Sequence, residues 1–334
     1  MVAIVWGCKK EVKLSSTKLV TGQIFTEGLR VDGHEFDSLV IENCTFEGKP
    51  LTISNADYVI VRNCTFHDID KLGVWVGVYG EAKNVLIDNC SFENIGGNGI
   101  DSHENAPNGT ITNCIFKNTA LSDIDAAMGQ PHHAIYWKGK NVRITQCSFI
   151  GGEQEFGNAI SVRSSGLISG NRVQGFPKNA ITYFSDHPGE DSLIIENNFL
   201  WNNTYSISLT TNGNEAYFNK NIVIRFNSLI QSENYSIYIS NEFKNLTNVF
   251  IYGNIIVNPT DEYFKKFDDY AQFSLNLKSN DDIGFVDMSN GDLHLKNSSI
   301  GNGYCDSLTF FPLTDIDGET RIQMNLDAGA DEIN

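Results

Sequence analysis

The chain has 334 residues, a formal net charge of -17 and a pI near 4.7. Nucleic-acid binding and attachment to an anionic membrane surface both need a basic patch, so this acidic balance argues against either partner. No apolar run reaches the ~18 residues of a membrane span. Hydrophobic residues make up 41% of the chain and charged residues only 19%. That composition, rich in Asn, Ser, Thr and Ile, provides a sizeable core and favours strands and turns over helices.

The first residues contain Gly7-Cys8, which resembles the end of a bacterial lipoprotein signal. No basic segment precedes this dipeptide, and the apolar run before it is short for a signal peptide. We therefore expect either a truncated start or an ordinary N-terminal strand.

A short phrase of the form Asn-Cys-Thr-Phe recurs between about residues 24 and 258. Its second position is spaced 20 to 33 residues apart along the chain, and this position changes from Cys to Asn halfway. A period in the twenties with strand-like phrases predicts a solenoid. The members are Cys44, Cys64, Cys90, Cys114, Cys147, Asn171, Asn198, Asn227 and Asn254.

A second column of apolar residues runs in step with the first, and each member begins a segment that alternates apolar and polar residues. Such alternation predicts a strand with one buried face. Stacked short strands predict an all-β fold, a right-handed parallel β-helix of about nine to ten coils, over residues 1–258. Residues 259–334 would form C-terminal coils and a cap on the same solenoid. The column is Leu29, Leu51, Val74, Ile100, Ile135, Ile160, Ile181, Ile207 and Ile237.

Cysteines in such a stack lie ~4.8 Å apart and point the same way, which is poor geometry for disulfides. We therefore expect buried thiols in the first half of the stack and an amide ladder in the second. No CxxC pair indicates a metal site.

Side chains beside the inward isoleucines should point outward. Three consecutive coils then present Asp101 with His103, Tyr136 with Lys138, and Ser161 with Arg163. This is the one place where titratable groups of both signs gather, and the residue types suit acid–base chemistry. The alternative is an inert, salt-bridged surface patch.

The coil that leads into Tyr136 is expanded by an insertion at residues 119–133, which maps to a loop on one face of a solenoid. We expect it to bring Asp123, Asp125, His132 and His133 to the rim of the site. Zinc at the two histidines is disfavoured because adjacent strand residues point to opposite faces. The expected substrate-binding residues are Trp75, His132, His133, Ser161, Phe184 and Tyr238.

The final stretch contains Asp315-Ile316-Asp317-Gly318 and later Asp331-Glu332, and it resembles the ending of many bacterial β-helix proteins. Its expected role is to cover an open end of the solenoid. A calcium loop at Asp315 and Asp317 is the alternative, although the later ligands of a full loop do not follow. We expect no cofactor, with calcium as the one possibility.

Several phrases resemble carbohydrate-active enzymes built on this fold. Gly99-Ile100-Asp101-Ser102-His103-Glu104 resembles the Asp-Pro-His-Glu motif of the β-helical mannuronan C5-epimerases, with Ser in place of Pro. Lys138 followed one coil later by Arg163 resembles the Lys and Arg pair of family 6 polysaccharide lyases. Tyr136 with Lys138 as a pair without metal resembles family 31 alginate lyases.

The resemblance implies removal of the C5 proton of a uronic acid in an acidic, alginate-like polysaccharide. Arg163 and His103 would neutralise the carboxylate, Lys138 and Tyr136 would act as base and acid, and Asp101 would orient them. β-Elimination after this step would make the protein a polysaccharide lyase. A C5-epimerase and a non-catalytic glycan-binding protein are the alternatives. We expect a monomer that is secreted, periplasmic or a surface lipoprotein, because polymeric uronates lie outside the cytoplasm.

Overall fold

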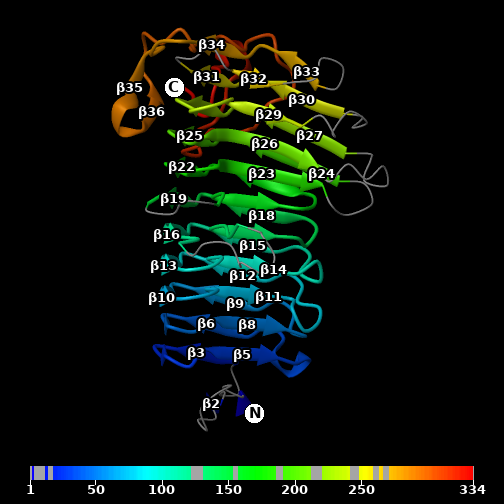
Figure 1. Cartoon of the computed structure of the whole chain (residues 1–334). Coiled ribbons are helices and arrows are strands. Elements are labelled where there is room, and N and C mark those ends of the chain that lie inside the picture. Colours follow the sequence, from blue (N-terminus) through cyan, green and yellow to red (C-terminus); the bar gives the residue numbers. More distant parts are fainter. Residues whose placement is uncertain are drawn as a thin grey trace. The chain divides into compact units, whose positions relative to one another are not determined.

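A computed structural model describes residues 2–3, 12–13, 18–121, 131–152, 157–185, 191–211, 220–240, 248–258, 263–265 and 271–333. Almost all regular structure in these residues is short β-strand (Figure 1). The chain divides into two compact units, residues 1–165 and 166–334. The boundary expected at residue 258 stays a prediction. The helical segments described are the 3-10 turns η1 (His34–Phe36), η4 (Met288–Asn290) and η5 (Gln323–Asn325).

The first unit stacks coils that each add one strand to three parallel sheets, six strands to a sheet among the described residues. A separate antiparallel pair, β1 (Val2–Ala3) and β2 (Val12–Lys13), precedes them. Sheet I contains β3 (Leu19–Thr21), β6 (Val40–Glu42), β9 (Ile60–Arg62), β12 (Leu86–Asp88), β15 (Thr110–Thr112) and β18 (Val142–Thr145). Sheet II contains β4 (Ile24–Phe25), β7 (Thr45–Glu47), β10 (Thr65–Ile69), β13 (Ser91–Ile95), β16 (Ile115–Thr119) and β19 (Ser148–Ile150). Sheet III contains β5 (Leu29–Asp32), β8 (Leu51–Ser54), β11 (Val74–Val76), β14 (Ile100–Ser102), β17 (Ile135–Trp137) and β20 (Ile160–Val162).

The second unit repeats the same three-sheet plan, with four or five described strands to a sheet. The number of coils in the described part of the chain differs slightly from the nine to ten expected. Its hairpin, β35 (Phe285–Asp287) and β36 (Asp292–Leu295), is antiparallel. One sheet contains β21 (Gly166–Ser169), β24 (Asp191–Glu196), β27 (Lys220–Arg225), β30 (Asn248–Tyr252) and β33 (Ala271–Ser274). The second contains β22 (Arg172–Gln174), β25 (Phe199–Trp201), β28 (Ser228–Ile230), β31 (Ile255–Val257) and β34 (Leu277–Ser279). The third contains β23 (Asn179–Ser185), β26 (Tyr205–Thr211), β29 (Ile237–Ile239) and β32 (Phe264–Lys265). The all-β parallel β-helix is thus confirmed.

The register of sheet III is the one that the apolar column predicts. Val74 pairs with Ile100, Ile100 with Ile135, and Ile135 with Ile160. All four side chains are fully buried. Because strand side chains alternate between the two faces, this register also fixes which residues point outward.

Like side chains stack on like inside the first unit. Successive phenylalanine rings from Phe25 to Phe149 lie 4.6–4.9 Å apart between centroids and are nearly parallel. The five ladder cysteines are buried thiols, as predicted. Each thiol donates to a backbone carbonyl, as Cys90 Sγ does to the Asp88 oxygen at 3.3 Å. Cys8 lies outside the described residues.

The amide ladder predicted for the second half is confirmed within the second unit. The Nδ2 of Asn198 donates to Asn227 Oδ1 at 2.8 Å, and the Nδ2 of Asn227 donates to Asn254 Oδ1 at 2.9 Å. Asn171 and Asn276 extend the ladder at its two ends. The same amides also donate to backbone carbonyls, so the ladder satisfies the backbone where each coil turns.

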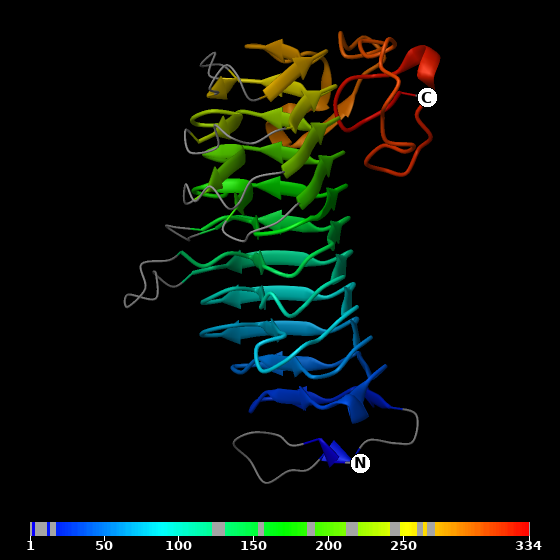
Figure 2. The same cartoon turned by 90° about the vertical axis from the view of Figure 1, so that its right-hand side faces the viewer.

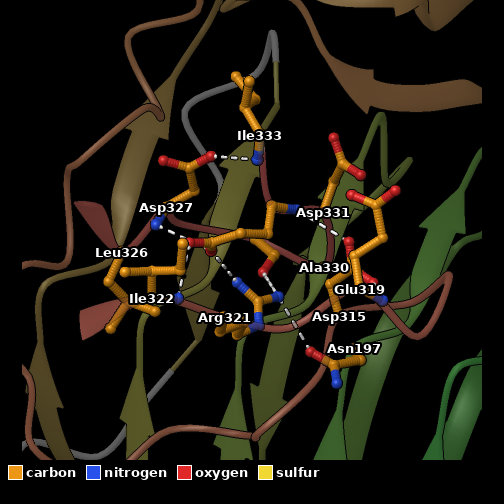
Figure 3. A network of polar contacts seen from close by, with 12 residues as sticks. Asn197, Asp315, Glu319, Arg321, Ile322, Leu326, Asp327, Ala330, Asp331 and Ile333 are labelled. Atoms are coloured by element: carbon orange, nitrogen blue, oxygen red, sulfur yellow. Dashed lines mark hydrogen bonds and ion pairs between the residues drawn. The ribbon is translucent and has the colours of Figure 1, made fainter. Parts of the chain in front are cut away.

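The C-terminal segment packs against β25, β28, β31 and β34 of the second unit and shares a hydrophobic core with them (Figure 2). A buried arginine holds it there (Figure 3). The Nη1 of Arg321 donates to Glu332 at 2.9 Å, and its Nη2 donates to Gly329 O at 2.8 Å and Asn197 Oδ1 at 3.1 Å. Its guanidinium also lies 4.7 Å from the ring centroid of Phe226. These partners compensate the burial of the charge.

Replacement of Asn227 by leucine should test the amide ladder. The substitution leaves two carbonyls and the Asn198 amide without their partner, so we expect the free energy of unfolding to fall by about 3 kcal/mol or more. Asn221→Leu, at an exposed position of the same unit, should change it by less than about 0.5 kcal/mol. Equal denaturation midpoints for the two variants would show that the ladder is not stabilising.

Candidate active site

Strand β17 presents Tyr136 outward because its two neighbours are buried. Ile135 and Trp137 are 0% and 1% exposed. The indole of Trp137 packs where Gly109 has no side chain, since a Cβ at Gly109 would lie 2.0 Å from the indole Cζ2. Packing of Ile135 and Trp137 on the inner face therefore fixes the predicted alternation of inward and outward side chains in this strand.

The ring of Tyr136 forms the centre of the candidate site, with two cations beside it. Lys138 Nζ and Arg163 Cζ each lie 4.9 Å from the Tyr136 ring centroid. The His133 ring packs beside the Tyr136 ring, with the two ring centroids 5.4 Å apart and the planes tilted by 47°. The structure thus brings Tyr136, Lys138 and Arg163 together, and the two cations make the surface around the phenol positively charged.

Asp101 on β14 pairs with Tyr136 on β17 in sheet III, and its environment is unusual for a carboxylate. Burial raises its pKa to about 6, although a hydrogen bond from Asn98 and the charge of Lys138 act in the opposite direction. The Nδ2 of Asn98 donates to Asp101 Oδ2 at 2.7 Å. Asp101 is thus a carboxyl group that changes its charge near neutral pH.

A hydrogen-bonded row of polar residues that we did not predict, Asn98, His133 and Asn158, lies next to the site on adjacent coils. The backbone N–H of His133 donates to Asn98 Oδ1 at 2.6 Å, and the backbone N–H of Asn158 donates to His133 Nδ1 at 3.2 Å. Because Nδ1 accepts, the neutral His133 ring carries its proton on Nε2. The signal was present in the sequence, since Asn98, His133 and Asn158 each stand two residues before an isoleucine of the apolar column.

Two residues differ from the expected exposure. His133 was expected at the rim, but it is 5% exposed because it forms part of the hydrogen-bonded row of polar residues. Ser161 was expected to face solvent, but it is 1% exposed. Its short side chain lies directly beside Tyr136 in the sheet, which accounts for its burial. His132 is partly exposed, and Asp123 and Asp125 lie outside the described residues.

His103 follows strand β14, and its backbone N–H donates to Val76 O at 2.9 Å. Its Nδ1 is buried and has no hydrogen-bond partner in the part of the chain that the structure describes. Buried polar atoms of this kind often meet a ligand or an ordered water molecule.

The remaining predicted substrate-binding residues fall in both units. Trp75 is partly exposed in the first unit and pairs with Asp101 in the sheet. Phe184 and Tyr238 are partly exposed in the second unit, where Tyr238 packs edge-on against Tyr205 with 5.6 Å between ring centroids.

One group in the described residues has the composition of a metal site, and it lies in the second unit. Atoms of His294, Asp317 and Asp331 lie within 4.8 Å of one another. Asp317 is already engaged, by His294 Nε2 at 2.7 Å and by Arg172 Nη2 at 2.9 Å. Asp315 accepts the backbone N–H of Asp317 at 2.9 Å. Nothing here tests calcium binding at Asp315 and Asp317, which stays the alternative to the expected absence of a cofactor.

Comparisons with known proteins give a match to a family model and a similar solved structure. A family model described as "Right handed beta helix region" matches residues 11–131. No curated protein matches the sequence. Among solved structures, the chain is similar to the A-module of mannuronan C-5 epimerase AlgE4 from Azotobacter vinelandii. The identity is 12% and the TM-score 0.39, over 78% of this chain and 87% of that one. No helix in the described residues is long and apolar enough to cross a membrane.

Replacement of Asp101 by asparagine should make stability depend less on pH. The pKa of Asp101 is higher in the folded protein, about 6, than the 3.8 of an ordinary aspartate, so its contribution favours folding at low pH and is lost as the pH rises through this window. We expect the melting temperature of Asp101→Asn relative to wild type to increase between about pH 4 and about pH 7. Asp70→Asn, at an exposed carboxylate of the same unit, should show no such trend. A constant difference across the range would contradict the assignment.

Proposed function

We propose that the protein is a polysaccharide lyase that cleaves an acidic, uronate-containing polysaccharide by β-elimination. The observation that carries the proposal is the group of charges around the Tyr136 phenol. Lys138 Nζ and Arg163 Cζ each lie 4.9 Å from its ring centroid, and the carboxyl group of Asp101 pairs with it in the sheet. This cationic cluster belongs to a chain of net charge -17, so it is a local exception to the charge of the protein. Such a cluster suits an anionic sugar.

The first requirement of the reaction is to make the C5 proton of a uronate removable. That proton is weakly acidic while the neighbouring carboxylate keeps its full charge. Arg163 supplies a guanidinium that can bind the carboxylate through two hydrogen bonds and stabilise the charge that develops on it. Arg163 donates its backbone N–H to Trp137 O at 3.0 Å, which fixes the position of its main chain beside β17.

The second requirement is a base for the C5 proton and an acid for the leaving oxygen. Either the phenolate of Tyr136 or the neutral amine of Lys138 takes the proton, the electron pair of the C5–H bond forms a C4–C5 double bond, and the C4–O bond breaks. The other residue of the pair returns a proton to the departing oxygen, so that charge and atoms balance. Their proximity, 4.9 Å from the Lys138 Nζ to the ring, supports a shared role.

The third element is orientation. The backbone N–H of Lys138 donates to Ser102 Oγ at 2.9 Å, and the Asp101 carboxylate attracts the Lys138 charge. Asn98 holds that carboxylate in place. We assign Asp101 and Asn98 as positioning residues, and we assign His103 to the substrate, because its buried Nδ1 has no partner within the described residues.

Alanine variants of Lys138 and Arg163 should test the proposal on alginate, pectate, glucuronan and glycosaminoglycans, with ultraviolet absorbance of the unsaturated product as the measurement. We expect the wild type to act on at least one of them. Lys138→Ala should lower kcat by about 10²- to 10⁴-fold, and Arg163→Ala by about 10²-fold or more, with modest changes in binding.

Lys140→Ala and Arg143→Ala are the matched controls, because both side chains are exposed in the same unit and Arg143 belongs to sheet I. They should retain wild-type turnover. If the control variants lose as much activity as the Lys138 and Arg163 variants, the cluster is not the active site.

A further inference from the structure

A cluster of one arginine and two aromatic residues lies on the first unit, away from Tyr136. The ring centroids of Trp75 and Tyr79 are 6.1 Å apart with their planes tilted by 56°. The guanidinium carbon of Arg30 lies 4.2 Å from the Tyr79 ring centroid. Tyr79 nevertheless remains 55% exposed. A large aromatic side chain that the fold leaves open to solvent is available to a ligand.

This cluster shares a row of sheet III with the candidate active site. Arg30 pairs with Thr52, Thr52 with Trp75, and Trp75 with Asp101, which pairs with Tyr136. Successive members of the row are separated by one strand spacing, ~4.8 Å. A sugar chain bound at Tyr136 and extended along the row therefore passes Asp101, then meets Trp75, and then the Arg30–Tyr79 pair.

Contacts within the cluster hold it in place without a ligand. Arg30 forms an ion pair with Asp32, and Asn55 Nδ2 donates to the same carboxylate at 2.7 Å. The backbone N–H of Tyr79 donates to Ser54 Oγ at 3.2 Å, which ties the loop after β11 to the preceding coil. A surface that is ordered in advance loses less entropy when a ligand binds.

We propose that Trp75, Tyr79 and Arg30 form an outer subsite that binds pyranose rings of the same polysaccharide. The proposal rests on the proposed function for the identity of the sugar chain. The two aromatic faces pack against the C–H face of a sugar, and the guanidinium donates to sugar hydroxyls. Because Asp32 offsets the charge of Arg30, this subsite recognises the ring more than its carboxylate, in contrast to the cationic cluster at Tyr136.

The test is the affinity of oligouronates of two lengths, measured by calorimetry on the full chain in a Lys138→Ala background to prevent turnover. Tyr79→Ala and Trp75→Ala should each weaken binding of a hexasaccharide by about tenfold and leave binding of a disaccharide unchanged. Tyr79→Phe keeps the ring and should bind the hexasaccharide as the background protein does. Tyr58→Ala removes a tyrosine that is 58% exposed beside sheet I and should have no effect.

The outcomes separate this inference from the proposed function. If the hexasaccharide binds Tyr79→Ala as tightly as Tyr58→Ala, the subsite is overturned even where the wild type forms product. If binding depends on Trp75 and Tyr79 while the wild type forms no product, the subsite stands and the lyase proposal fails. If no oligouronate binds the background protein, both are overturned.

Discussion

The structure depends on one constraint, which is that equivalent residues of successive coils pair in register within a parallel sheet. Each coil must then place the same kind of side chain at the same place, ~4.8 Å from its neighbour. The nearly parallel phenylalanine rings, 4.6–4.9 Å apart between centroids, meet this requirement in the core of the first unit. Outside, the same rule brings Asp101 and Tyr136 together, although 34 residues separate them in the sequence. A slip of one residue would exchange the inner and outer faces and remove the candidate site.

The two units meet this constraint with different chemistry. The first fills its turn with thiols such as Cys90, which donates weakly to a carbonyl. The neighbouring Cys114 thiol and burial raise the pKa of Cys90, which keeps it neutral. The second fills the same place with amides such as Asn227, which donate to two carbonyls and to the next amide. An amide forms stronger hydrogen bonds than a thiol. Removal of Asn227 also leaves more groups without a partner, because its side chain has several partners. The site at Tyr136 belongs to the unit with the thiols.

Much of this could be predicted from the sequence, because a repeat makes local patterns report long-range contacts. The phrase containing Cys90 and the column containing Ile135 predicted the sheets, the register and the outward direction of Tyr136, Lys138 and Arg163. The burial of Ser161 could not be predicted, because the alternation of a strand says which way a side chain points but not what covers it. The hydrogen bonds of Arg321 could not be predicted either. Its partner Asn197 lies 124 residues away and belongs to no column that we identified.

The account claims that one face of three coils removes the C5 proton of a uronate. The measurement that tests this most directly is a proton NMR time course of an oligouronate with the protein in deuterated water. We predict that the H5 signal disappears while a vinyl H4 signal of the unsaturated sugar appears, and that Lys138→Ala abolishes both changes. Exchange of H5 without the vinyl signal would indicate epimerisation through the same first step. An H5 signal that persists for every uronate tested would contradict the central claim.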